Sequence, residues 1–205
     1  MGWILPTILD TKYKSILSRE RSLAKAVASA VIDTPSISVW EIMIPILFLF
    51  NFLRFKRARE TFSLNFLFTK RLALDAALEM VGKGKTKEEA KFQIRAKTGN
   101  ILAADKKGIY SSKIRQRQMN EIELLMDHYC RMLKAEGKDY LAMVKNAYQN
   151  SGEYAAFLKE LERAEKAVNQ AAMQVVRTHS AGEIVSRMEE VPEKIRMAEI
   201  ENIFG

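Results

Sequence analysis

Residues 154–175 read YAAFLKELERAEKAVNQAAMQV, and this regular stretch decides the fold class. From Tyr154 onward its apolar residues alternate gaps of three and four, which is the spacing of a heptad repeat. We expect a helix that packs against antiparallel neighbours inside one bundle; a separate coiled-coil dimer is the alternative. The predicted helix seam consists of Phe157, Leu161, Ala164, Val168, Ala171 and Val175.

Helical signals continue in both directions from this stretch. Apolar residues recur with a helical period over residues 7–32, and Asp33-Thr34-Pro35 then stops the helix because a residue before proline leaves the α region. A second clear stripe predicts a helix over residues 112–135, and a shorter helix follows over 139–149. No glycine or proline lies in residues 46–81, so that range allows one long helix or two nearly continuous ones.

Three capping boxes predict helix starts, because a Ser or Thr and a Glu three residues later satisfy the first backbone N–H groups reciprocally. They begin at Ser38, Thr86 and Ser180. We expect the helix after Thr86 to end near Lys97, where Gly99-Asn100 follows, and the helical region after Ser180 to be interrupted at Pro192. The prediction is an all-α helical bundle.

Residues 36–59, SISVWEIMIPILFLFNFLRFKRAR, are the exception to an otherwise polar chain. Thirteen of the seventeen residues from 37 to 53 are apolar, and a basic cluster follows directly. At about 1.5 Å per residue a helix of this length would be about 25 Å long, short of the roughly 30 Å hydrocarbon core of a bilayer. We therefore expect a long apolar helix or helical hairpin near the N-terminus that inserts shallowly or re-enters. A buried core or partner-facing helix is the alternative.

The flanks of this segment favour a membrane. Tryptophan is typical of the membrane interface, and basic residues are attracted to anionic lipid at the cytoplasmic surface. More Lys and Arg follow the segment than precede it, so if the segment crosses we expect the C-terminal part of the chain in the cytoplasm. The predicted membrane-contact residues are Trp40, Phe48, Phe50, Phe52, Arg54, Lys56, Arg57 and Arg59.

Charge is distributed unevenly behind a formal net charge of +8. Residues 1–120 hold 22 Lys and Arg against 10 Asp and Glu, whereas residues 121–205 hold 11 against 15. Eleven of the basic residues lie between Lys83 and Arg117. Such a block is a solvated helix face, a surface for anionic lipid, or a contact for a nucleic-acid backbone.

Candidate chemical sites are weak. Gly82-Lys83-Gly84-Lys85-Thr86 ends like a phosphate-binding loop, but it lacks the first glycine and follows a predicted helix rather than a strand. His179 and Glu183 have metal-site spacing across a predicted helix boundary, and His128 and Cys130 fall on opposite edges of an apolar stripe. A single cysteine and two histidines leave no disulfide and no thiol cluster for zinc. We predict no catalytic, cofactor or metal site.

These patterns divide the chain into an N-terminal amphipathic helix (1–36), an apolar and basic membrane-associated segment (37–81) and a cytoplasmic helical bundle (82–205). The predicted function is a non-enzymatic membrane-associated protein that anchors this bundle for interaction with a partner. The predicted partners are an anionic membrane surface and an unidentified protein or a second copy of the chain. The alternative is a soluble structural or nucleic-acid-binding subunit whose apolar segment is buried in a core or interface.

Overall fold

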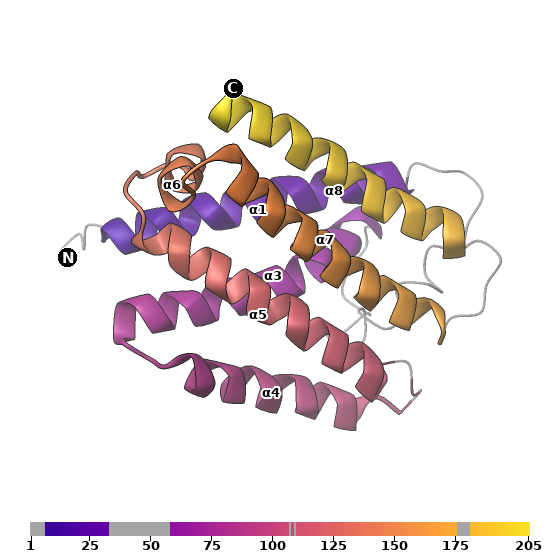
Figure 1. The fold of residues 1–205 in the computed structure, drawn as a ribbon. Helices are drawn as coiled ribbons and strands as arrows, with labels where there is room; N and C mark the ends of the chain where they lie inside the picture. Colours follow the sequence, from indigo (N-terminus) through magenta and orange to yellow (C-terminus); the bar gives the residue numbers. More distant parts are fainter. Residues whose placement is uncertain (1–6, 33–57, 107, 109, 176–180) are drawn as a thin grey trace, which may run out of the picture.

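The structure of this chain, a computed structural model, describes residues 7–32, 58–106, 108, 110–175 and 181–205 (Figure 1). All regular structure within these ranges is helical, which confirms the predicted all-α fold. Among the described helices none is both long enough and apolar enough to span a membrane. The helices are α1 (Ile8–Ile32), α3 (Ala58–Lys83), α4 (Lys87–Ala104), α5 (Ser112–Lys134), α6 (Tyr140–Ala147), α7 (Ser151–Met173) and α8 (Ala181–Phe204).

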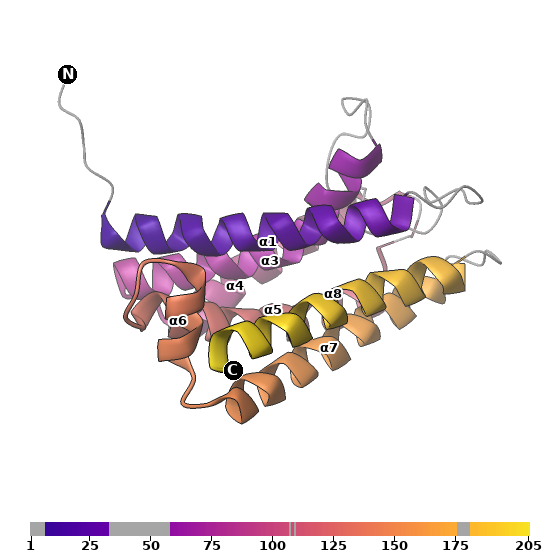
Figure 2. The same cartoon turned by 90° about the horizontal axis from the view of Figure 1, so that it is seen from above.

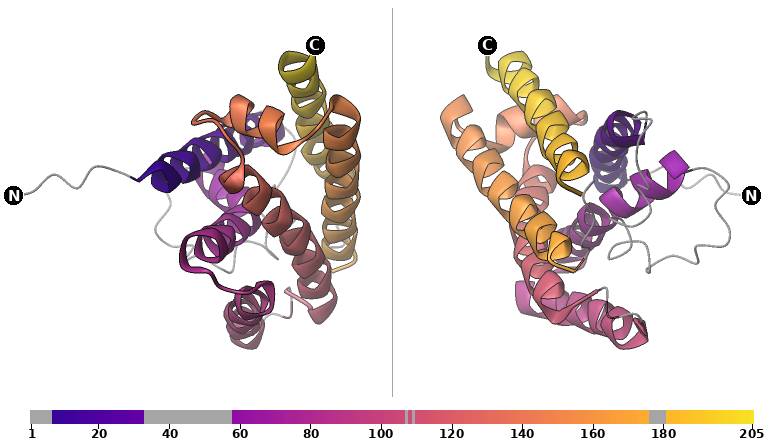
Figure 3. Two further views of the ribbon diagram at one scale, coloured as in Figure 1. Left: turned by 60° about the vertical axis from the view of Figure 1, so that its left-hand side comes forward. Right: turned by 90° about the vertical axis from the view of Figure 1, so that its right-hand side faces the viewer.

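Five helices close into a ring around the core. In the order α1, α3, α5, α7 and α8, each packs against the next, and α8 packs back against α1. Helix α4 lies outside the ring against α3 and α5, and α6 covers one end of it against α1, α5 and α8. The two views of Figure 3 show α7 and α8 side by side, with α4 on the far side of α5.

Local sequence determines where several helices begin. The side chains of Thr86, Ser111, Asp139 and Asn150 each accept a backbone N–H three residues later, which satisfies a donor that the helix itself leaves unpaired. At α4 both halves of the capping box are present, as predicted. The box expected at Ser38 and the first residue of the box at Ser180 lie outside the described residues.

Two predicted helix breaks are wrong. Helix α4 continues through Gly99 to Ala104. Arg115 of α5 holds this turn, donating to the Thr98 hydroxyl at 3.0 Å and to the Arg95 carbonyl at 2.7 Å. Helix α8 continues through Pro192 because buried residues lie on both sides of the proline, so packing against α1 and α7 outweighs the lost hydrogen bond.

The main core is shared by all helices of the bundle. Its most deeply buried members include Ile16 of α1, Leu74 of α3, and Ile122 and Met126 of α5, all inaccessible to solvent. Burying a side chain of this size contributes about 1.5–3 kcal/mol. Helices from all three segments of the sequence therefore depend on one another for stability.

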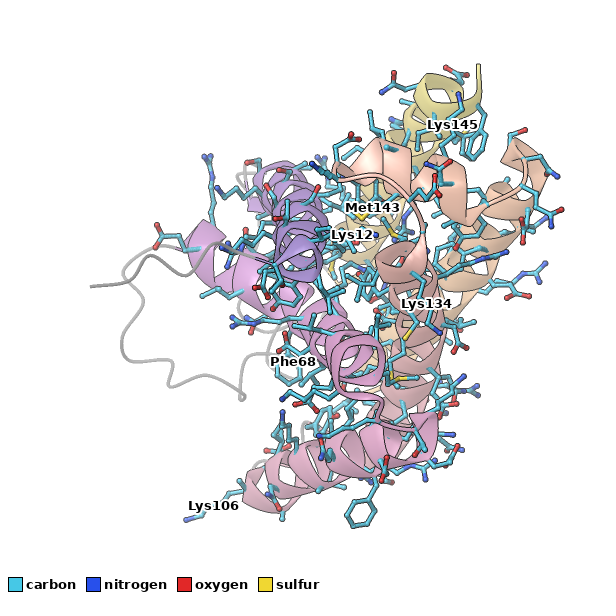
Figure 4. The ribbon with its side chains drawn as sticks, turned by 90° about the vertical axis from the view of Figure 1, so that its left-hand side faces the viewer. Lys12, Phe68, Lys106, Lys134, Met143 and Lys145 are labelled. Atoms are coloured by element: carbon cyan, nitrogen blue, oxygen red, sulfur yellow. The ribbon has the colours of Figure 1, made fainter. Side chains whose placement is uncertain are left out.

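A buried lysine fastens the start of α1 to the end of α5. Lys12 is 8% exposed, and its ammonium group donates to the carbonyl oxygens of Leu133, at 3.2 Å, and Ala135. Figure 4 shows Lys12 beside this end of α5, with Lys134 and Met143 nearby. The carbonyl groups at a helix C-terminus carry partial negative charge, so a cation stabilises them there.

Candidate functional site

Most residues predicted to contact the membrane lie outside the described part of the chain. Arg59 is the exception: it lies exposed in the first turn of α3. The undescribed members of the set are Trp40, Phe48, Phe50, Phe52, Arg54, Lys56 and Arg57.

The helices on either side of this segment meet in one small core. Val31 near the end of α1 and Phe62 near the start of α3 are 0% and 1% exposed, and both pack in a cluster with Ile184 of α8. Figure 2 shows the end of α1 and the first turns of α3 at the same end of the molecule. The connection from Ile32 to Ala58 therefore starts and finishes at one end of the bundle.

This topology constrains any contact with a bilayer. A segment that crosses once leaves its two ends on opposite sides of a hydrocarbon core roughly 30 Å thick. Val31 and Phe62 share one core, so they lie on the same side. A single crossing between them does not fit this bundle.

An apolar groove of about 480 Å³ runs between α1 and α3 at this end. Its floor contains Ala24 and Ala28 of α1, both 1% exposed, and Leu67 of α3. The Ser63 hydroxyl donates to the Ala24 carbonyl oxygen at 3.4 Å, which marks the close approach of the two helices. Leu64 lines the groove with 37% of its surface exposed.

Cations from both helices form the rim of the groove. Arg21 and Lys25 are exposed on successive turns of α1, and neither makes a hydrogen bond or ion pair with any residue that the structure describes. Arg59 and Glu60 of α3 complete the rim and have protein contacts of their own. Three cations against one carboxylate make the rim positive.

A second concentration of charge lies in the interior, where each of the five ring helices contributes one ionisable side chain. Lys70 is 2% exposed and pairs with Glu165 at 2.8 Å; Arg196 binds both oxygens of the same carboxylate at 2.8 Å. We call the five side chains the ionic centre. Its members are Glu20 of α1, Lys70 of α3, Glu121 of α5, Glu165 of α7 and Arg196 of α8.

The two central carboxylates respond differently to burial. Burial raises the pKa of Glu121 to about 7, and nearby Lys70 only partly opposes that shift. Burial also disfavours ionised Glu165, but Arg196 and Lys70 outweigh it and lower the pKa of Glu165 to about 2. Glu165 is therefore ionised beside the two cations, whereas Glu121 exchanges its proton near neutral pH.

Polar atoms beside the ionic centre lack partners. The side-chain amide of Asn65 is buried, and neither its oxygen nor its nitrogen makes a hydrogen bond with the described residues. A cavity of about 60 Å³, lined in part by Asn65, Lys70 and Glu121, has room for a few waters. The centre can hold water and a proton, but its charges are compensated within the protein, which is typical of a structural role.

His128 belongs to an aromatic cluster. Its ring is 5% exposed and stacks on Phe157 with centroids 4.3 Å apart, and Nδ1 lies 2.6 Å from the Tyr148 hydroxyl. Burial, assisted by nearby cations, lowers the pKa of His128 to about 3, so the ring is neutral. Cys130 lies elsewhere, with Sγ 3.8 Å from the sulfur of Met80.

No group of three or more potential metal ligands is found among the described residues. His179 lies outside them, and the structure does not describe the side chain of Glu183. The predicted metal-like spacing of these two residues therefore stays untested.

Part of the basic block around α4 is paired with acids of the protein. Lys87 pairs with Asp127 at 2.7 Å, Lys85 with Glu79 at 2.6 Å, and Lys91 with Glu123 at 3.2 Å. Arg95, Lys97 and Arg117 of the same block make no ion pair with a residue that the structure describes, so a nucleic-acid surface here stays an untested alternative.

The predicted seam of α7 packs against α5 and α8 within the bundle. Leu161, Val168 and Ala171 are buried, Phe157 and Ala164 are partly exposed, and Val175 is 38% exposed just beyond the helix end.

Sequence reasoning missed both the ionic centre and the groove. The sequence offers only one local indication of the ionic centre, a lysine at position 70 within an apolar stretch of helix. The groove left another: Arg21 and Lys25 alternate with Ala24 and Ala28 at helical spacing. Neither signal says which residues of other helices lie opposite.

Comparison with protein-family models, with curated proteins and with solved structures found no significant match.

Proposed function

We propose that this chain is a non-enzymatic, membrane-associated helical protein. In this proposal apolar residues 37–53 contact the bilayer and hold the helical bundle at the cytoplasmic face of the membrane. There the bundle interacts with a partner. The observation that carries the proposal is the shared core of Val31 and Phe62, because it brings both ends of the apolar segment to the end of the bundle where the groove lies.

The charge at this end supports the proposal. Arg21, Lys25 and Arg59 surround the groove, and Arg54, Lys56 and Arg57 immediately precede α3 in the sequence. Each basic residue near an anionic leaflet contributes about 1 kcal/mol of attraction. This end of the bundle therefore matches the charge of a membrane surface.

The mode of contact follows from the same geometry. Because both ends lie on one side, residues 37–53 enter the bilayer and return, or lie within its interface. Their length, short of a full span, agrees with either arrangement. The proposal thus retains shallow or re-entrant insertion and discards a single crossing.

The bundle also offers surface to a partner protein. Phe92 on α4 and Met197 on α8 are 73% and 60% exposed. Isolated apolar side chains are ordinary on protein surfaces, so neither residue identifies the partner.

Flotation with liposomes tests the proposal. We expect the purified chain to float with vesicles of phosphatidylcholine and phosphatidylglycerol in high salt, because inserted apolar side chains are not screened by ions. Changing Phe48, Phe50 and Phe52 together to Ser should abolish flotation, whereas the exposed control Phe92→Ser should leave it intact. A wild-type protein that stays unbound and monodisperse would contradict membrane association.

A further inference from the structure

The groove between α1 and α3 has the chemistry of an amphiphile site. Its volume of about 480 Å³ falls in the range of small-molecule pockets. The groove follows α1 from Arg21 to Ser29, a rise of about 12 Å at about 1.5 Å per residue. The groove is therefore elongated, with a floor of alanine and leucine.

The chemistry of the rim selects the headgroup. Arg21 and Lys25 are exposed beside this floor without a carboxylate partner among the described residues, so their charges are available to an anion. Arg59 adds a third positive charge across the groove. Glu60 is the single acid among the residues that line it. An apolar chain ending in a phosphate would satisfy both parts of the site.

We infer that this groove binds one acyl chain of an anionic membrane phospholipid, with the lipid phosphate between Arg21 and Lys25. The inference rests on the proposed function in taking the bilayer as the source of the lipid. It adds a specific lipid contact on the described helices to the contact made by residues 37–53. The groove would hold the end of the bundle against the headgroup layer.

Calorimetric titration of the full chain with dodecyl phosphate, below the concentration at which it forms micelles, tests the site. We expect saturable binding of one molecule per chain, and much weaker binding of the uncharged dodecyl maltoside. The double change Arg21→Gln and Lys25→Gln should weaken binding of dodecyl phosphate about 30-fold, as expected for two cations near an anionic headgroup.

Matched variants separate binding from folding. Leu64→Asp should abolish binding, whereas Leu141→Asp, at a leucine of similar exposure on α6, should not. Lys14→Gln, at an exposed lysine of α1 outside the groove, should bind as wild type does. Thermal unfolding followed by circular dichroism checks that each variant is folded.

Three results would overturn the inference. The first is that dodecyl phosphate does not bind the wild-type chain, or binds Leu64→Asp equally well. The second is binding only after Phe48, Phe50 and Phe52 are changed to Ser, which would assign the groove to the apolar segment of the chain itself. The third is a dimer that Leu64→Asp dissociates, which would make the groove a contact between two copies.

The soluble amphiphile also separates this inference from the proposed function. Saturable binding in a chain that fails to float would support the groove and contradict membrane anchoring. Flotation of a wild-type chain that does not bind dodecyl phosphate would contradict the groove and leave membrane anchoring in place.

Discussion

The ionic centre and the rim of the groove both place cations beside apolar side chains. The cations of the centre are paired within the protein, whereas two of those at the rim have no partner among the described residues. At the centre, Lys70 and Arg196 are 2% and 8% exposed and share the carboxylate of Glu165. At the rim, Arg21 and Lys25 are exposed and have no partner among the described residues. Helices α1 and α3 contribute to both regions.

This difference separates residues of the fold from residues of the surface. A buried charge that loses its partner destabilises the fold, so the free energy of unfolding depends on the pairs of the ionic centre. An exposed cation without a partner contributes little to stability and can attract an anion from outside. Changes at the centre should therefore affect unfolding, and changes at the rim should affect binding.

Removing the shared carboxylate should have the largest effect. Glu165→Gln leaves Lys70 and Arg196 buried without their counter-ion, and we expect a loss of about 3–5 kcal/mol in the free energy of unfolding. Urea denaturation measures it. The control Glu190→Gln removes the partner of exposed Lys194 and should cost less than about 1 kcal/mol. Equal effects of the two changes would show that the carboxylate of the ionic centre matters no more to stability than an exposed one.

Glu121 tests the centre through pH. Its folded pKa of about 7 lies above its ordinary value, so the folded chain holds an extra proton at intermediate pH and loses stability as pH rises through 7. We expect this loss to be about 2–3 kcal/mol, and Glu121→Gln to remove it. The difference in unfolding free energy between variant and wild type, measured at pH 5 and pH 9, should favour the variant at the higher pH. A difference independent of pH would contradict the assignment.

His128 tests how burial of an ionisable group without a counter-ion affects the dependence of stability on pH. Its folded pKa of about 3 lies below its ordinary value, so protonation favours the unfolded chain and stability falls as pH drops below about 6.5. At pH 5 this contribution is about 2 kcal/mol. His128→Phe keeps the stacking on Phe157 and should make unfolding less sensitive to acid between pH 7 and pH 5. Parallel stability curves for the two proteins would show that the histidine does not titrate in this way.

The rim should show the smallest effect on stability. The double change Arg21→Gln and Lys25→Gln should alter the free energy of unfolding by less than about 0.5 kcal/mol, because these side chains make no described contact that the fold needs. Flotation with anionic vesicles at low salt should nevertheless weaken. A large loss of stability would show that the rim belongs to the fold, as the centre does.

The sequence predicts those parts of this fold that depend on local chemistry. Capping at Thr86 and the apolar stripe of α5 act within a few residues, so their helices are found from sequence alone. The continuation of α4 through Gly99 and of α8 through Pro192 is not found from sequence alone. It depends on Arg115 of another helix and on the packing of α8 against other helices.

The sites are harder to predict for the same reason. Five residues on five helices meet in the ionic centre, and no sequence spacing relates Lys70 to Glu165 or Arg196. The apolar segment was found from composition, but its relation to the groove required the shared core of Val31 and Phe62.

The central claim is that the groove end of the bundle faces an anionic membrane. Spin labels attached through Ser29→Cys at the groove and Lys145→Cys on α6, each with Cys130→Ala, test it on vesicles of phosphatidylcholine and phosphatidylglycerol. We predict that the label at position 29 becomes accessible to oxygen and shielded from a water-soluble relaxation agent, whereas the label at position 145 stays in water. Labels that are equally exposed to water at both positions would contradict the account.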